Sequence, residues 1–175
     1  MNWQRILVAI GANLPGPDGR TALQNCEWAA RQLQVLPGLR LDALSRWYES
    51  APVPASDQPP FVNGVALLSG AADPQALMAA LHGIEAAADR TRSVPNAART
   101  LDLDLIAMDG LVLDGPLRLP HPRAAERAFV LAPLCDVAPG WRHPRLGQTA
   151  ADLLPGVRGQ AIRMLPLPGG ADATK

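Results

Sequence analysis

The segment Arg99-Thr-Leu-Asp-Leu-Asp-Leu-Ile106 places two carboxylates two residues apart. In a β-strand, side chains at i and i+2 point to the same face, roughly 6.6 to 6.8 Å apart along the chain. Asp102 and Asp104 are therefore expected to share one face, while the leucines between them point into a core. Like charges in this arrangement repel, and Asp is a poor strand former, so the pattern favours a bound cation. Mg²⁺ is the natural candidate because it combines one or two carboxylates with phosphate oxygens and water. The structural alternative is a half-exposed strand that shows Asp to water.

Basic residues surround this acidic strand in the sequence. Arg90, Arg92 and Arg99 lie in the segment that leads into it. A guanidinium is planar and stays protonated, which suits two-point contacts with phosphate. Phosphoryl transfer needs metal ions and arginines to neutralise developing charge, and it leaves little covalent chemistry to the protein. The alternative is a set of surface salt bridges.

Polar and aromatic residues also lie close together in sequence in other segments. The runs Leu119-Pro-His121-Pro-Arg123 and Arg127-Ala-Phe129 add an imidazole, two guanidiniums and a phenyl ring, and Phe61-Val-Asn63 places a ring and an amide on one face of a strand. Because the chain contains only two Phe and one Tyr, these rings are candidates for stacking on a flat ligand. Core packing remains the default explanation for either ring alone.

The composition narrows the classes of function. A chain of 175 residues is about one domain and can bury a sizeable core. Its formal net charge of +0 offers no field for nucleic acid or an anionic membrane. Lys175 is the only lysine, which excludes a phosphate-binding-loop lysine, a Schiff base and a protein-kinase lysine. Cys26 and Cys135 lie in no CxxC and are interpreted as two buried thiols. The apolar run 6–10 is too short for a signal peptide or a membrane span, so a cytoplasmic protein is expected.

Hydrophobic periodicity outlines the elements that must position these residues. Their order, strand, helix, strand, strand, helix, strand, is that of a ferredoxin-like split unit, an α+β fold with helices on one face of a mainly antiparallel sheet. Residues 1–165 are expected to form a single domain, with 166–175 as a flexible tail. The irregular segments 51–60 and 91–98 lie beside the candidate chemistry, and loops of this kind are often functional. The expected strands are 6–10, 39–48, 61–68, 101–108 and 161–165, and the expected helices are 21–36, one that begins at Asp73-Pro74, and 124–131.

Several of these motifs, in this order, resemble the 6-hydroxymethyl-7,8-dihydropterin pyrophosphokinases of folate biosynthesis. The resemblance covers residues 5 to about 155 and rests on separate motifs rather than on the acidic run alone. It implies a ferredoxin-like enzyme that transfers pyrophosphate from ATP to the pterin hydroxymethyl group and releases AMP. The motifs are Arg99-Thr-Leu-Asp-Leu-Asp-Leu-Ile106, Leu119-Pro-His121, Arg127-Ala-Phe129, Gly11-Ala-Asn13-Leu14 and Asp57-Gln-Pro-Pro-Phe61-Val-Asn63.

The resemblance also implies roles for individual residues. Asp102 and Asp104 would hold two Mg²⁺ ions, Phe61 and Phe129 would sandwich the pterin, and Asn63 would read its hydrogen-bonding edge. The backbone around Ser50 and Val53 would assist Asn63. The triphosphate would contact Arg90, Arg92, Arg99, His121 and Arg127, and the nucleotide would lie near His82 and Glu85.

Three positions depart from the family pattern. Asn96 stands where an aromatic residue often closes over the pterin, Pro122 stands where an aromatic residue can occur, and His82 replaces a familiar Gln. Two alternatives therefore stay open: a relative that acts on another pterin-like alcohol, and a non-catalytic ferredoxin-like binding module. Small molecules are the expected partners, with no nucleic acid and no membrane, and the chain is expected to be a monomer.

Overall fold

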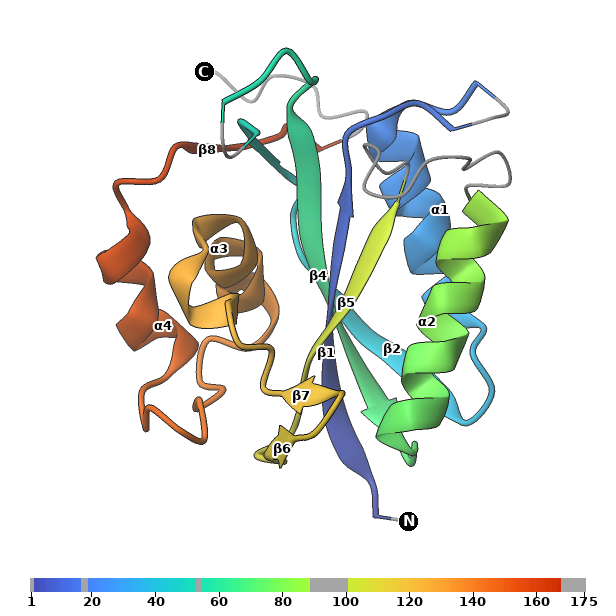
Figure 1. The fold of residues 1–175 in the computed structure, drawn as a ribbon, viewed down its shortest axis with the longest axis vertical. Coiled ribbons are helices and arrows are strands. Elements are labelled where there is room, and N and C mark those ends of the chain that lie inside the picture. Colours follow the sequence, from blue (N-terminus) through green and yellow to red (C-terminus); the bar gives the residue numbers. More distant parts are fainter. Residues whose placement is uncertain (1, 17–18, 53–54, 89–100, 168–175) are drawn as a thin grey trace.

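The computed structural model describes residues 2–16, 19–52, 55–88 and 101–167 (Figure 1). The strands are β1 (Gln4–Ala12), β2 (Leu39–Leu44), β3 (Tyr48–Ser50), β4 (Phe61–Gly70), β5 (Asp102–Met108), β6 (Leu113–Asp114), β7 (Arg118–Leu119) and β8 (Ile162–Met164). The helices are α1 (Ala22–Gln34), α2 (Pro74–Ala88), α3 (Ala128–Val137) and α4 (Ala150–Leu153), with 3₁₀ turns η1 (Ala124–Glu126) and η2 (Leu154–Val157).

One antiparallel sheet organises the molecule. Its strand order is β5-β1-β4-β3-β8, and β2 also pairs with β4. Strands β6 and β7 form a separate small ribbon. The mainly antiparallel sheet predicted from the sequence is confirmed.

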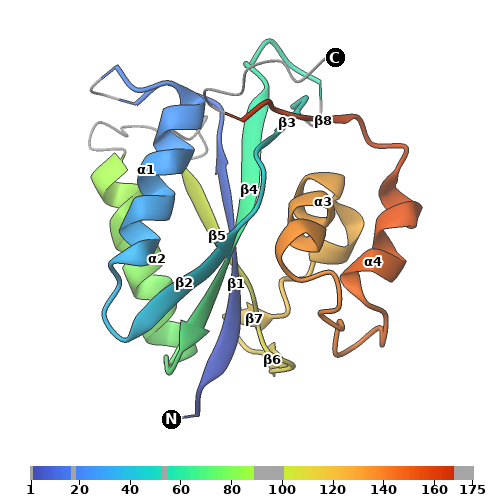
Figure 2. The ribbon, with the colours of Figure 1, turned by 180° about the vertical axis from the view of Figure 1, so that it is seen from behind.

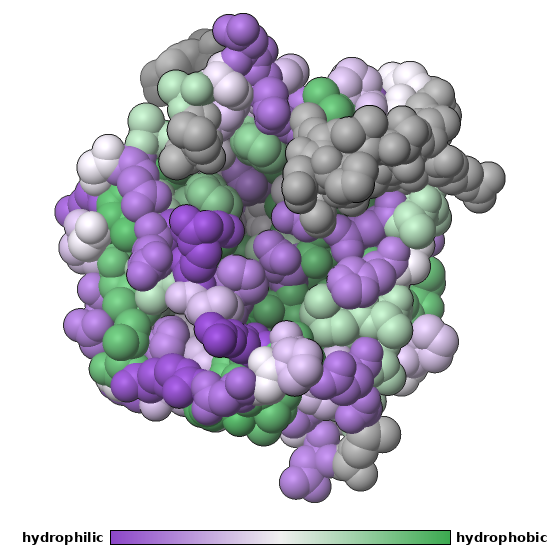
Figure 3. Space-filling model, viewed as in Figure 1, coloured by the Kyte–Doolittle hydropathy of each residue, from purple (hydrophilic) through white to green (hydrophobic). Residues whose placement is uncertain are grey.

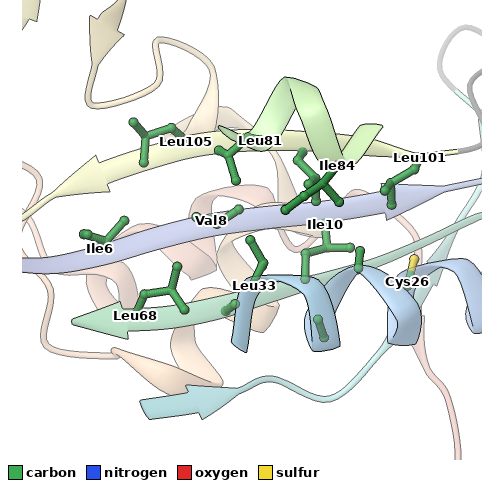
Figure 4. Close-up of a cluster of buried hydrophobic side chains, with 14 of the residues drawn as sticks. Ile6, Val8, Ile10, Cys26, Leu33, Leu68, Leu81, Ile84, Leu101 and Leu105 are labelled. Carbon is green, nitrogen blue, oxygen red and sulfur yellow. The ribbon is translucent and has the colours of Figure 1, made fainter. Parts of the chain in front are cut away.

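Helices α1 and α2 cover one face of the sheet (Figures 1 and 2). The apolar run 6–10 of β1 sends Ile6, Val8 and Ile10 to this side, where they pack with side chains of both helices. Figure 4 shows Leu33 of α1 and Leu81 of α2 directed at these strand residues. This cluster is the largest of the three buried apolar clusters among the described residues, and its close packing makes the sheet a rigid support.

Both covering helices begin with side-chain caps. Thr21, which was expected to lie inside the first helix, instead caps α1 in a reciprocal capping box with Gln24. Asp73 accepts a hydrogen bond from the backbone N of Ala76 at 3.0 Å, directly before Pro74 opens α2. Four residues of α2 that recur every three or four positions are buried against the sheet: Leu77, Leu81, Ile84 and Ala88.

Helices α3 and α4 lie on the opposite face, which corrects the expectation of helices on one face only. The alternate residues of the same strands, such as Leu7 and Ile106, pack with α3 there. The predicted helix over 124–131 instead begins as the turn η1, and α3 then continues to Val137. A strand buried on both faces needs a second layer, and α3 supplies it because its residues are almost all apolar.

The strand expected over 39–48 is interrupted. It divides into β2 and β3, which pair with opposite halves of β4. At the break, Ser45 Oγ accepts a hydrogen bond from the backbone N of Val65 at 2.8 Å. The serine hydroxyl thereby replaces a ladder bond that a continuous strand would have made. None of the helices in the described ranges has the length and apolar character needed to cross a membrane.

Candidate active site

The acidic strand and Asn63 lie in one row across the sheet. Asp102 pairs with Gly11, and Gly11 pairs with Asn63 on its other side. Residues paired across strands point to the same face, so the three positions face α3 together. Asp104 pairs with Ala9 in the next row. The central strand therefore contributes only small residues between the carboxylates and the amide, which leaves room above the sheet.

A cavity of about 580 Å³ occupies this room. Its floor is formed by β5, β1 and β4, and its wall by η1, the start of α3 and the segment before β8. Figure 3 looks onto this side of the molecule and shows hydrophilic side chains around the hollow between α3 and the sheet. The predicted site residues that line the cavity are Ser50, Phe61, Asn63, Asp102, Asp104, Arg127 and Phe129.

Asn63 is held in one orientation at the floor. Its Nδ2 donates a hydrogen bond to Ser50 Oγ at 2.9 Å, and both side chains are buried. This bond fixes the orientation of the amide, so Asn63 can offer its carbonyl oxygen to a ligand. A Cβ at Gly11 would lie 3.1 Å from that oxygen, so glycine keeps this edge of the cavity open.

Two aromatic rings and a guanidinium stand in the wall. Phe61 comes from β4 and Phe129 from the first turn of α3, and both line the cavity. The Arg127 guanidinium lies 5.3 Å from the centroid of the Phe129 ring, a cation–π contact. A flat ring and a polyphosphate could therefore bind side by side.

Positive charge is concentrated on the η1 side of the cavity. Burial and the Arg123 charge lower the pKa of Arg127, while Asp104 and Asp102 oppose that shift. Arg127 thus lies within electrostatic reach of both carboxylates, and it stays protonated because guanidinium pKa values are so high.

His121 lies beside this group, and its surroundings favour the neutral ring. Burial and then Arg127 lower its pKa, whereas Asp102 raises it. Its Nδ1 accepts a hydrogen bond from the backbone N of Arg123 at 3.2 Å. The neutral ring therefore carries its proton on Nε2, where it can donate to an anion.

The residues predicted near the nucleotide lie on α2. Glu85 Oε2 accepts a hydrogen bond from the backbone N of Leu103 at 3.4 Å, which ties α2 to the edge strand β5. His82 is exposed one turn earlier on the helix. Neither these two residues nor His121 lines the cavity, so any contact they make with a nucleotide lies beside it.

Four predicted site residues fall outside the described parts of the chain. They are Val53, Arg90, Arg92 and Arg99. The departure at Asn96 also falls there, whereas Pro122 is described.

Sequence reasoning did not assign three polar residues that line the cavity. Arg123 was noticed as a guanidinium but given no role, and Glu126 lies two residues short of α3. Gln160 approaches from the segment before β8. Arg123 could have been found from its place in the Leu119-Pro-His121-Pro-Arg123 run. No local signal points to Gln160, because its side-chain hydrogen bonds are with residues more than thirty positions earlier.

Comparison with known proteins identifies the family. The sequence model of the 7,8-dihydro-6-hydroxymethylpterin-pyrophosphokinase family matches residues 7–139. The chain belongs to this family. The resemblance inferred from the motifs is confirmed, and with it the ATP-dependent pyrophosphokinase class.

Two bacterial relatives cover most of the chain. It is 40% identical over 164 residues to the 2-amino-4-hydroxy-6-hydroxymethyldihydropteridine pyrophosphokinase of Pseudomonas aeruginosa, covering 93% of this chain and 98% of the relative. It is 36% identical over 149 residues to the enzyme of the same name from Synechocystis, covering 85% of this chain and 73% of the relative.

Solved structures agree on the fold. A Plasmodium falciparum HPPK-DHPS triple mutant superposes with a TM-score of 0.64 at 13% identity, over 89% of this chain. The wild-type protein from the same organism gives 0.65 at 12% identity. This chain spans 44% of the first of those structures and 43% of the second. The ferredoxin-like architecture is therefore confirmed.

Proposed function

We propose that this cavity transfers the β,γ-pyrophosphoryl group of ATP to the hydroxymethyl oxygen of 6-hydroxymethyl-7,8-dihydropterin and releases AMP. The observation that carries the proposal is the placement of two same-face carboxylates, an arginine and two aromatic rings around one cavity. Family membership supplies the class of reaction, and the lining of the cavity supports the roles proposed below for individual residues.

The donor set fits Mg²⁺. Asp102 and Asp104 provide hard oxygen ligands on one face. Within the described residues, no group of three or more His, Cys, Asp or Glu side chains is arranged to hold a metal. Phosphate oxygens and water can supply the remaining ligands, which is the mixed coordination that Mg²⁺ prefers. When bound, two such ions would neutralise and orient the polyphosphate between the carboxylates.

In this proposal, cationic side chains bind the triphosphate from the side of the cavity across from the two carboxylates. Arg127 lies within electrostatic reach of both aspartates, so a phosphate group held beside those carboxylates would lie close to its guanidinium. His121 donates from Nε2, and Arg123 adds a second guanidinium at the cavity wall. Arg90, Arg92 and Arg99 complete this set in the proposal, from a segment next to β5 in sequence. His82 and Glu85 would contact the nucleoside from α2.

The pterin lies between the two rings in this proposal. Phe61 and Phe129 offer aromatic faces from β4 and α3, and stacking of a flat base on such rings contributes about 1 to 3 kcal/mol per base. Asn63 Oδ1, fixed by Ser50, accepts from the N–H groups of the pterin edge. The backbone around Val53 adds to this recognition.

Asp102 then orients the nucleophile. It lies on the row that contains Asn63, so a ring bound at Asn63 directs its substituent toward this carboxylate. Asp102 favours ionisation of the hydroxymethyl group as its oxygen bonds to the β-phosphorus. The bond from the β-phosphorus to the α,β-bridging oxygen breaks, and AMP leaves with that oxygen.

The setting proposed for this reaction is the cytoplasm, with one domain over 1–165, a tail over 166–175 and a monomeric chain. Both cysteines are free thiols, as suits a reducing compartment. The balanced charge supports small-molecule substrates rather than nucleic acid.

Chromatography of the nucleotides tests the assignment. The protein is incubated with Mg²⁺-ATP and 6-hydroxymethyl-7,8-dihydropterin, and AMP is expected in a one-to-one ratio to the pterin consumed. In the matched control, 6-methyl-7,8-dihydropterin fills the same site without a nucleophile and gives no AMP. Accumulation of ADP, or ATP loss that is indifferent to the pterin, contradicts the proposal. Preferential use of dihydroneopterin instead indicates the relative that acts on another pterin-like alcohol.

A further inference from the structure

The side-chain amide of Gln160 binds the backbone on both sides of Arg127. Its Oε1 accepts from the backbone N of Ala128 at 2.9 Å, and its Nε2 donates to the carbonyl O of Glu126 at 2.7 Å. These two groups belong to the peptide units that flank the Arg127 Cα. One amide therefore fixes both backbone angles of the arginine.

This contact replaces a missing cap. Arg127 occupies the N-cap position of α3 in an extended conformation, and its side chain makes no capping hydrogen bond. The first N–H groups of a helix need partners from outside it, and Gln160 supplies one for Ala128. The arginine side chain is thereby left to point into the cavity, where it stacks on Phe129.

Gln160 is itself held by apolar packing against α3. Val157 packs with Ala128 and Leu131, and the neighbouring Ile162 joins the same cluster. The backbone N of Gln160 donates to the carbonyl O of Val157 at 3.0 Å, and Ile162 pairs with Ser50 across β3 and β8. The segment is therefore anchored at both ends, so its amide is a fixed reference for the start of α3.

We propose that Gln160 is a positioning residue that acts on ATP through Arg127. The inference rests on the proposed function of the cavity. It concerns a part of the chain beyond the match to the family model, which ends at residue 139. Without the amide, the peptides around Arg127 can rotate, and the guanidinium loses its fixed direction toward the phosphates.

The test compares variants of graded hydrogen-bonding capacity. Gln160→Leu removes both bonds at similar size, whereas Gln160→Glu keeps an acceptor for Ala128 and loses the donor to Glu126. We expect Gln160→Leu to lower kcat/KM for ATP about three- to tenfold, the typical worth of one or two such bonds, with Gln160→Glu between it and the wild type. KM for the pterin should change less than twofold. Gln148→Leu, in an exposed glutamine away from the cavity, is the matched control and should leave both values unchanged.

A double-mutant cycle separates positioning from general destabilisation. In an Arg127→Ala background, Gln160→Leu should lower kcat/KM for ATP by less than a further twofold, because the guanidinium through which Gln160 acts is already absent. An equal loss in both backgrounds, or wild-type kinetics for Gln160→Leu, overturns the inference. If Gln160→Leu does not fold, the same cycle is run with Gln160→Glu.

A readout independent of turnover keeps this inference distinct from the proposed function. Amide hydrogen exchange at Ala128 should be faster in Gln160→Leu than in the wild type, and affinity for a non-hydrolysable ATP analogue with Mg²⁺ should fall with it. If the wild type forms no AMP from the pterin, the proposed function fails, while these two measurements still decide the role of Gln160. Unchanged exchange and unchanged analogue binding contradict it.

Discussion

At the scale of single residues, the site depends on the small side chains of the central strand β1. Ala9 and Gly11 lie between the acidic strand and β4, and neither rises far above the sheet. A larger side chain at either position would fill the floor of the cavity. Charge and stacking groups can therefore converge on one space only because their neighbours are small.

Replacing the aspartates should abolish catalysis without unfolding the chain. Asp102→Asn and Asp104→Asn keep the shape of the strand but remove the charge that would bind Mg²⁺, so we expect AMP formation to fall by at least about a hundredfold. The stabilisation of the wild type by Mg²⁺-ATP in a thermal shift assay should be lost with it. Asp114→Asn is the matched control, since this exposed carboxylate pairs with Arg145 on the surface, away from the cavity. Near-normal turnover in either cavity variant would contradict the metal assignment.

At the scale of elements, the helices α1 and α2 support the site from behind. They bury Val8, Ile10 and Leu103 on the face opposite the carboxylates, so the direction of the acidic side chains is set by the packing of the alternate leucines. The site then inherits the rigidity of this core.

Removing the cap of α1 should destabilise the protein without changing its chemistry. Thr21→Ala breaks the capping box with Gln24, which costs about 1 kcal/mol. For a chain of this size that corresponds to a fall in Tm of about 2 to 4 °C. Thr21→Ser keeps the hydroxyl and should retain the wild-type Tm. A calorimetric scan measures the shift, and a loss of AMP formation in Thr21→Ala at 25 °C would argue against a purely structural role.

At the scale of the whole molecule, the sheet is enclosed between two helical layers of unequal extent. Helices α1 and α2 cover one face, while α3 and α4 share the other face with the cavity. His143 is buried in the α4 side of this second layer, and its Nδ1 accepts hydrogen bonds from the backbone N of Arg145 and Leu146, both at 3.2 Å. This layer therefore contains an imidazole that must remain unprotonated at Nδ1.

The stability of the molecule should consequently fall on mild acidification. Burial and then Arg145 lower the pKa of His143, so the unfolded state binds a proton more readily than the folded state. The neutral ring contributes fully to the free energy of unfolding at pH values above the unfolded pKa of about 6.5. This stabilisation is lost as the pH falls from there through the lower pKa of the folded state. His121 titrates in the same direction. His143→Asn can still accept a backbone hydrogen bond and should flatten the dependence of Tm on pH between about 7.5 and 5. An unchanged slope would show that His143 does not contribute to it.

The sequence alone determined the local elements and the chemical character of the site. Alternation in the acidic strand placed Asp102 and Asp104 on one face and the leucines on the other, and Asp73-Pro74 marked the start of the second helix. Periodicity and capping act within a few residues, so they can be recognised without a fold. The ordered motifs also identified the family, and the fold followed from it.

Only the tertiary structure decided what closes the cavity. Contacts between distant segments place α3 on the second face, interrupt the strand over 39–48 at Ser45, and join the Gln160 amide to the backbone around Arg127. Such contacts also determine that His82 and Glu85 do not line the cavity. Strand register and helix docking set these contacts, and neither leaves a periodic signal in the segments involved. The residues proposed for the chemistry could thus be predicted from their residue types and spacing. Gln160, which we propose positions Arg127, could be found only from the tertiary structure, because the two residues are distant in sequence.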